Sequence, residues 1–378
     1  MKKTLNDALI LLSVTLFTVT LFTMTWTIKN TFAQETNISE KTRQELVRKA
    51  ADYLRTSQGE DGSFSVSPRS GIGPTAIITA GLLQNGVSVT DPIVAKSLGY
   101  LKTFVQRDGG IYAPPGRIKN YETSVMILAF HLANTAGEYD TLLKDAEKFL
   151  RDSQFDELDG YSKTDPYYGG VGYGNDSRPD LSNTQFFIDA LHVTGHGADD
   201  PAIQKALVFV SKCQNLKSDE NPPSQKLENP DGGFFYTNAG GGENAAGRDA
   251  AGGLRSYGSM TYAGLKSMIF AGLTSEDPRV KAAEDWLKER YQLDENPGLG
   301  KRGLYYYYQT MGNTLSALGK EFFVTKDGTQ HHWKQELIET LAKKQQTDGS
   351  WVNTDPMWME NDPNLVTGFV LMVLADCK

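Results

Sequence analysis

The chain has 378 residues, a net charge of -8 and only two cysteines, Cys213 and Cys377. Two cysteines exclude a disulfide-rich scaffold and a zinc site made of four thiolates. The acidic balance, without a stripe rich in lysine and arginine, argues against a nucleic-acid-binding protein. The length would allow two domains, but an unbroken internal repeat indicates a single domain.

The N-terminal segment has the features of an export signal. Lys2 and Lys3 precede an uncharged run from Ala8 to Trp26, and Thr31-Phe32-Ala33 resembles a signal-peptidase site. The run is longer than a typical signal core, so residues 1–33 are predicted to be either a signal peptide or an uncleaved N-terminal anchor. We therefore expect an exported protein, which is periplasmic, secreted or membrane-anchored, and which contacts a membrane only if this segment is retained.

A turn signature recurs six times after the linker. The clearest copies, Gln58 to Phe64 and Gln345 to Trp351, read Gln-x-x-Asp-Gly-Ser-aromatic, and Gln106 to Tyr112 is one residue shorter. Glycine accepts the torsions that end a helix, aspartate bonds nearby amides, and the aromatic ring packs on the next unit. Because the turn recurs, we interpret it as architectural. The looser copies run from Gln154 to Asp159-Gly160-Tyr161, from Gln214 to Asp231-Gly232-Gly233-Phe234, and from Gln292 to Gly303-Leu304-Tyr305.

Two kinds of helix alternate between these turns. The first kind has a polar face and often opens with Asp-Pro, as at Asp91, Asp200 and Asp277, where the aspartate caps the helix. The second kind is more uniformly apolar. The alternation of an outer helix that has one solvent-exposed face with a buried inner helix predicts a two-layered ring. The inner helices are expected to open near Thr75, Thr123, Thr184, Thr261, Thr314 and Thr367.

The turn signature and the alternating helices resemble the repeats of squalene-hopene cyclases and protein prenyltransferase β-subunits, from roughly Thr42 to the C-terminus. The resemblance implies an all-α fold, an α/α toroid of six outer and six inner helices. Residues 34–40 would then be a linker and residues 41–378 a single domain of six helix pairs. Because the shared motif is a structural one, the resemblance leaves the activity open.

The catalytic groups of those families are missing here. Squalene-hopene-type cyclases protonate an isoprenoid with the middle aspartate of Asp-x-Asp-Asp-Thr, whereas residues 180–184 place Ser182 and Asn183 at the two central positions. A hydroxyl group is too weak an acid for that step, so classical cyclisation is not expected. Prenyltransferases bind zinc through an inner-ring cysteine, and neither Cys213 nor Cys377 fits that position. No metal and no cofactor are therefore expected.

Other groups remain candidates for chemistry or binding. Glu122 directly precedes an inner-helix threonine and Asp180 lies four residues before another. Neighbouring inner helices would place these carboxyl groups about 8–10 Å apart, close to the spacing in inverting glycosidases, although helix capping explains Glu122 more simply. The candidate ligand-binding residues are Ser182, Asn183, Tyr173, Tyr305, Tyr306 and Tyr307, although a tyrosine run beside a repeat turn can also serve packing.

Two functions are compatible with this sequence. The first is an exported ligand-binding or interaction toroid, whose ligand is a small molecule, an isoprenoid, a glycan or a protein. The alternative is an enzyme on the same scaffold, either a cyclase-like enzyme or a polysaccharide hydrolase or lyase that uses the carboxylates and tyrosines. The lining of the ring discriminates between them. A deep tunnel walled by phenylalanine and tryptophan would favour an isoprenoid, a shallow groove of tyrosines with two facing carboxylates would favour a sugar, and a central hole plugged by the Gly-rich loop would favour neither.

Overall fold

The computed structural model describes residues 39–65, 70–174, 177–217 and 230–378. The predicted export segment, residues 1–33, and most of the predicted linker lie outside these ranges. The chain divides into two compact units, Met1–Glu45 and Leu46–Lys378. The fold described below is that of the second unit. None of the helices in the described ranges is long and apolar enough to cross a bilayer.

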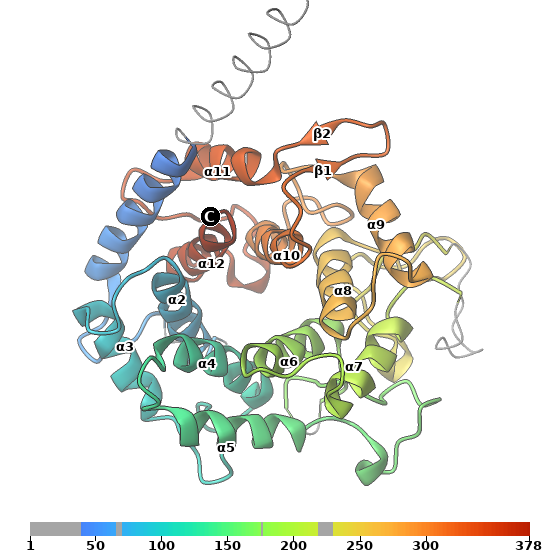
Figure 1. Cartoon of the computed structure of the whole chain (residues 1–378), viewed down its shortest axis with the longest axis horizontal. Helices are drawn as coiled ribbons and strands as arrows, with labels where there is room; N and C mark the ends of the chain where they lie inside the picture. Colours follow the sequence, from blue (N-terminus) through green and yellow to red (C-terminus); the bar gives the residue numbers. More distant parts are fainter. Residues whose placement is uncertain (1–38, 66–69, 175–176, 218–229) are drawn as a thin grey trace, which may run out of the picture. The chain divides into compact units, whose positions relative to one another are not determined.

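The described part of Leu46–Lys378 is an α/α toroid of six outer and six inner helices, as predicted (Figure 1). Each inner helix contacts the next, and α12 contacts α2, which closes the ring. The inner helices are α2 (Gly73–Gln84), α4 (Lys119–Ala133), α6 (Leu181–Val193), α8 (Gly258–Phe270), α10 (Leu304–Ala317) and α12 (Pro363–Asp376). The outer helices are the helix that ends at residue 57, α3 (Pro92–Lys102), α5 (Asp140–Arg151), α7 (Pro201–Lys212), α9 (Pro278–Arg290) and α11 (Trp333–Lys344).

Short elements complete the described chain. The antiparallel strands β1 (Phe323–Val324) and β2 (Gln330–His331) pair Phe323 with His331 between α10 and α11. They form the one named sheet in the described residues, so helices carry the fold. The remaining elements are the short 3-10 helices η1 (Glu157–Asp159), η2 (Ala239–Gly241) and η3 (Met357–Met359).

The two kinds of helix predicted from the sequence are both present. Outer helix α5 buries only Leu143, Ala146, Phe149 and Leu150, which recur at helical spacing on one face. Inner helix α12 is buried continuously from residue 365 to 374, because it lies between the outer ring and its inner neighbours. The hydrophobic core therefore forms a closed band between the two rings.

The Asp-Pro openings cap the outer helices as expected. The side chain of Asp91 accepts a hydrogen bond from the N–H of Ile93 at 3.2 Å, and Asp277 accepts one from Arg279 at 2.9 Å. Asp200 accepts hydrogen bonds from Ala202 and Ile203 in the same way. Each cap satisfies an amide that has no partner inside the helix.

Four of the six repeat turns lock their unit to the next through the glutamine side chain, whereas Gln106 bonds to the carbonyls of Phe104 and Tyr112. The Gln58 amide donates to the carbonyl of Gly62 in its own turn and to that of Ile93, in the first turn of the next outer helix, at 3.2 and 2.8 Å. The turn glycine packs closely, since a Cβ on Gly62 would lie 2.3 Å from the carbonyl oxygen of Lys96. The same pair of bonds joins Gln154 to Gly169 and Ala202, Gln214 to Gly232 and Arg279, and Gln345 to Gly349 and Leu46.

Two of the three looser copies of the turn differ from the sequence interpretation, whereas Gln214 bonds to Gly232 as predicted. Gln154 bonds to Gly169 and not to the Gly160 region, because an insertion carrying η1 separates the glutamine from its true turn. A Cβ on Gly160 would have nothing within 4 Å, so this glycine makes no close contact. Gln292 bonds to Glu295 at 3.4 Å, so the predicted fifth turn does not form this lock.

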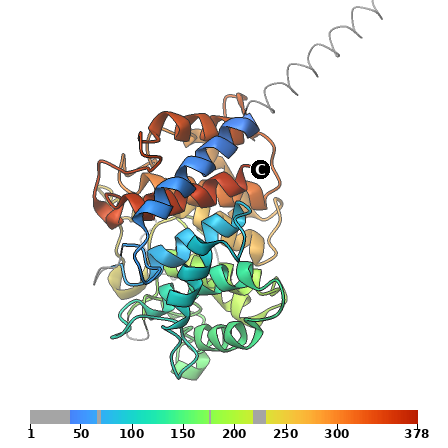
Figure 2. The same ribbon diagram turned by 90° about the vertical axis from the view of Figure 1, so that its left-hand side faces the viewer.

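The last turn closes the ring. Gln345 reaches the carbonyl of Leu46 at 3.2 Å, and Gly349 packs against the helix turn at Lys49. Figure 2 shows this seam from the side, with residues 46–57 in blue beside the red C-terminal helices. On the inner ring, Gly81 of α2 and Gly368 of α12 allow a close approach, since a Cβ on Gly81 would lie 2.8 Å from the Cβ of Leu371.

Candidate functional site

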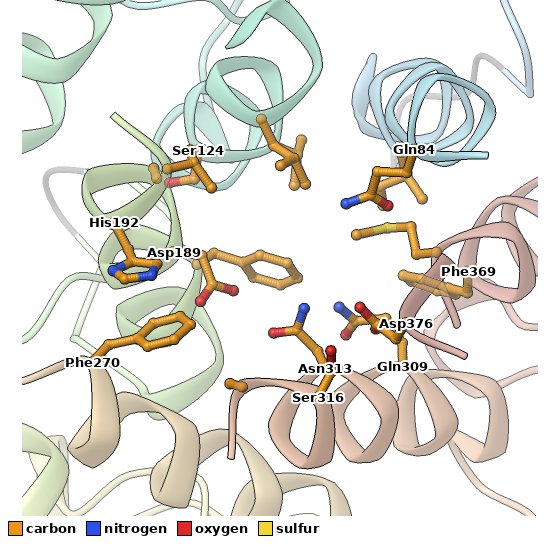
Figure 3. A pocket seen from close by; sticks show the side chains of 18 residues that line it. Gln84, Ser124, Asp189, His192, Phe270, Gln309, Asn313, Ser316, Phe369 and Asp376 are labelled. Atoms are coloured by element: carbon orange, nitrogen blue, oxygen red, sulfur yellow. The ribbon is translucent and has the colours of Figure 1, made fainter. Parts of the chain in front are cut away.

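A cavity of about 370 Å³ lies at the centre of the inner ring (Figure 3). Residues from all six inner helices line it, from their second turns to their C-terminal ends. The lining side chains at the very ends of their helices are Gln84, Val193, Phe270, Ala317 and Asp376. His192, Ser316 and Ala317 are exposed, so this end of the cavity reaches solvent. The cavity therefore follows the C-terminal halves of the inner helices.

The wall of the cavity is mostly hydrocarbon. Phenylalanine rings come from α6, α8 and α12, and aliphatic side chains come from α2 and α4. No tyrosine and no tryptophan is among the lining residues, which all lie in the described part of the chain. The apolar lining residues include Ile77, Val125, Leu128, Phe186, Ala190, Val193, Phe270, Phe369 and Met372.

Amide and carboxylate side chains also line the cavity. We call them the polar cluster: Gln84, Asp189, Gln309, Asn313 and Asp376. Figure 3 shows Gln309, Asn313 and Asp376 close together, with Asp189 projecting into the same space from α6. The lining is therefore amphipathic, with amides and carboxylates from α2, α6, α10 and α12 set among the hydrocarbon side chains. Such a lining can bind a ligand that has an apolar body and a polar group.

Asp189 is held by a buried lysine. Lys266 of α8 has a fully buried side chain, and its Nζ donates to Oδ2 of Asp189 at 2.6 Å. Oδ1 of Asp189 is buried and has no hydrogen-bond partner in the described structure. A buried ammonium group needs a close countercharge, so Lys266 fixes this carboxylate at the cavity wall and leaves one of its oxygens for another donor.

Asp376, the last residue of α12, has a strongly perturbed acidity. Its pKa is raised to about 7, chiefly by burial and also by the nearby charge of Asp189, while Lys266, Lys334 and Asn313 act in the opposite direction. The C-terminus of a helix also disfavours a negative charge. Its side chain is partly accessible, because it faces the cavity. Near neutral pH, the side chain of Asp376 is therefore protonated in one part of the molecules and ionised in the other.

Gln309 of α10 is the most deeply buried amide of the polar cluster. Its side chain is only 2% exposed, and its Oε1 has no hydrogen-bond partner in the described residues. The Oε1 of Gln84 is likewise buried without a partner. Buried amides without partners cost free energy, so their presence in a cavity wall indicates a place where a ligand group binds.

The predicted candidate Glu122 lies at the opposite, N-terminal end of the inner helices. Its two carboxylate oxygens accept hydrogen bonds from the backbone N–H groups of Ile72 at 2.8 Å and Ala113 at 3.1 Å. Burial raises the pKa of Glu122 to about 7, although these two bonds act against the shift. Glu122 is fully buried and does not line the cavity, and its catalytic role stays a prediction.

Replacing Glu122 with alanine should lower the free energy of unfolding by about 3 kcal/mol, because two amides in a buried region lose their acceptor. Chemical denaturation followed by circular dichroism measures this loss. Glu122→Gln retains one acceptor oxygen and should lose less. If Glu122→Ala is as stable as the wild type, the carboxylate does not hold the fold, and the catalytic interpretation gains support.

Asp180 and its predicted neighbours form a second group at the same end. Asp180 caps α6 by accepting hydrogen bonds from the backbone N–H of Asn183 at 2.8 Å and from its side chain at 2.7 Å. Burial raises the pKa of Asp180 to about 6, while bonds to Asn183 and Tyr236 oppose this. Tyr173 is 39% exposed beside the group, and a partly buried Ser182 bonds to the hydroxyl of Tyr306 at 2.9 Å.

The structure therefore brings together Asp180, Ser182, Asn183, Tyr173 and Tyr306, but it does not place them in the cavity. The rings of Tyr305 and Tyr307 are both buried, and Tyr307 donates to a backbone carbonyl in the loop before α10. Tyr306 contacts the rings of Phe186 and Phe369, which line the cavity, and Tyr121 also contacts Phe186. The ligand-binding role of Ser182, Asn183 and the four tyrosines stays a prediction.

Solved structures share this ring at low sequence identity. A variant of the type II terpene cyclase MstE from Scytonema, in complex with its substrate geranylgeranyl dihydroxybenzoate, is 11% identical over 90% of this chain and 99% of its own, with a TM-score of 0.53. A protein described as a novel alpha-amylase from Clostridium perfringens is 12% identical over 88% and 98% of the two chains, with a TM-score of 0.54. The fold is that of the terpenoid cyclase-like α/α toroids.

No protein-family model and no curated protein sequence matches this toroid. The two structural neighbours have different activities in their descriptions, so the shared ring defines a scaffold and not a reaction. The function must therefore be argued from the side chains of the central cavity.

Sequence reasoning missed the residues that give the toroid its polar cluster. Asp189, Lys266 and Asp376 are isolated charges within or at the end of apolar helices, and Gln309 follows the tyrosine run. A charge in an otherwise apolar inner helix has to be paired or functional, and that signal could have identified Asp189 and Lys266. The pairing of the two, which are 77 positions apart, required the structure.

Proposed function

We propose that this protein is a ligand-binding toroid that takes a small, largely apolar molecule with one polar end into its central cavity. The observation that carries the proposal is the amphipathic lining, in which a hydrocarbon wall faces buried polar atoms without partners. The cavity volume of about 370 Å³ falls within the range of small-molecule sites, which runs from about 300 to 1,000 Å³.

The wall favours a hydrocarbon over a sugar. Glycan sites stack sugar rings on tyrosine or tryptophan, and neither residue lines this cavity. Phe186, Phe270 and Phe369 supply aromatic surface without hydroxyl groups. The position of the cyclase acid is occupied by Ser182, so the proposal does not include proton-initiated cyclisation. Export of the protein, which the sequence of residues 1–33 predicts, is a further part of the proposal.

The neutral fluorophore N-phenyl-1-naphthylamine, which emits more strongly in apolar surroundings, tests the proposal. We expect saturable binding of one molecule per chain. Leu128→Trp places a larger side chain into the cavity and should abolish the binding. The matched control is Leu158→Trp, because Leu158 is 95% exposed on η1 and does not line the cavity.

Circular dichroism and the melting temperature establish that both variants are folded. Equal binding by the Leu128 and Leu158 variants would place the fluorophore outside the cavity and contradict the proposal. Failure of the wild-type protein to bind in a saturable manner would contradict it as well.

A further inference from the structure

We infer that the ligand of the central cavity is a cationic amphiphile, a protonated alkyl amine whose ammonium group lies between Asp189 and Asp376. The inference rests on the proposed function, because it names the chemical class of the ligand that the proposed function leaves open. Three independent features of the cavity support it: its charge, its hydrogen-bonding atoms and the ends of its helices.

The first feature is an excess of negative charge. Asp189 and Asp376 both line the cavity, and His192 is the one lining residue whose side chain can carry a positive charge. The charged groups that face Asp376 from neighbouring elements are Asp189 of α6, Lys266 of α8 and Lys334 of α11. Lys266 is already bonded to Asp189, and Lys334 donates to the backbone carbonyl of Lys378. No ion pair in the described residues involves Asp376, so its ionised form can pair with the cation of a ligand and disfavours an anionic ligand.

The second feature is the set of buried atoms without partners. Among the lining side chains these atoms are all oxygens: Oδ1 of Asp189, Oε1 of Gln309 and Oε1 of Gln84. The Gln309 side chain is 2% exposed and lies beside Asp376 in Figure 3. An ammonium group supplies three N–H donors and no acceptor. It therefore suits a site whose unsatisfied groups are acceptors.

The third feature is the direction of the inner helices. Five of them end at residues that line the cavity, so their C-terminal carbonyl groups gather at its open end. Helix C-termini carry partial negative charge and stabilise nearby cations. Phe270 at the end of α8 and Phe186 on α6 add aromatic surface, which attracts a cation while also covering an alkyl chain.

Three ligands with the same alkyl chain test the inference: decylamine, decanol and decanoate. Each is titrated against the full chain loaded with N-phenyl-1-naphthylamine, and the displacement of the fluorophore is measured at pH 8. We expect decylamine to bind about tenfold more tightly than decanol, since a hydrogen bond to a charged group contributes more than a neutral one. Decanoate should bind most weakly.

The preference for the amine should depend on Asp376. Asp376→Asn removes the charge, and the advantage of decylamine over decanol should disappear while the affinity for decanol is retained. Asn313→Asp adds a carboxylate beside Asp376 and should increase the advantage. Asp285→Asn, on the exposed surface of α9, removes an equal charge outside the cavity and should change neither affinity.

The pH dependence supplies a second readout. Because burial raises the pKa of Asp376 to about 7, its charge develops between pH 6 and 8, and decylamine should bind more tightly as the pH rises through this range. Decanol binding should stay constant. If the fluorophore binds but decanol or decanoate displaces it as well as decylamine does, the inference is wrong and the proposed function stands. If the fluorophore does not bind, both are overturned.

Discussion

Gly349→Val should lower the free energy of unfolding by about 4 kcal/mol or more, which is a large effect for a single substitution. Gly349 has a φ of +95°, a conformation that a β-branched residue adopts only under strain. A Cβ at this position would also lie 2.4 Å from the carbonyl oxygen of Lys49. The contact is at the seam where the last repeat meets the first. Denaturation with guanidinium, followed by circular dichroism, measures the effect.

Gly86→Val is the matched control. Gly86 has a φ of +87°, close to that of Gly349, but a Cβ there would have nothing within 4 Å. This variant isolates the backbone strain, which costs about 1–3 kcal/mol. The difference between the stability losses of the two variants measures how much the close packing at the seam contributes to stability. Equal losses would mean that packing across the seam contributes nothing to the stability of the toroid.

The ring could be predicted from sequence because each repeat carries local signals. Asp-Pro pairs begin outer helices, and Gln and Gly mark the turn that follows, so one strong copy identifies the weaker ones. The prediction was wrong where an insertion hides the spacing. Gln154 bonds to Gly169 across a loop that contains a decoy Asp-Gly-Tyr at Asp159. The local pattern does not show whether Gly160 or Gly169 packs against the next outer helix. That is decided by a contact between Gly169 and the backbone of Lys205.

The cavity was less predictable for a physical reason. An inner helix is apolar on all sides, so its sequence does not reveal which face points to the centre of the ring. Glu122 and Asp180 were predicted as candidates because they lie near the starts of inner helices. In the structure, both carboxylates accept hydrogen bonds from backbone amides, and that of Asp180 also accepts one from the side chain of Asn183. Asp189 and Asp376 lie near helix ends, where the lining residues meet only after six helices are assembled.

Lys266→Met should lower the free energy of unfolding by about 3–5 kcal/mol, although methionine fits the volume of the lysine stem and suits an apolar core. The expected loss comes from Asp189, which is the ion-pair partner of Lys266. Lys266 is fully buried and holds Asp189 at 2.6 Å, so its removal leaves a carboxylate without its countercharge in a largely apolar wall.

Two further variants separate the charge from the packing. The double variant with Lys266→Met and Asp189→Asn removes both charges, and it should recover most of the stability that the single variant loses. Lys212→Met removes another fully buried lysine, whose Nζ donates to the backbone carbonyls of Lys163 and Asp165, each at 2.6 Å. Carbonyl groups carry no net charge, so Asp189→Asn should not recover this loss. If Asp189→Asn fails to recover stability in the Lys266→Met background as well, the lysine serves as a packing group, and Asp189 needs no countercharge at the cavity wall.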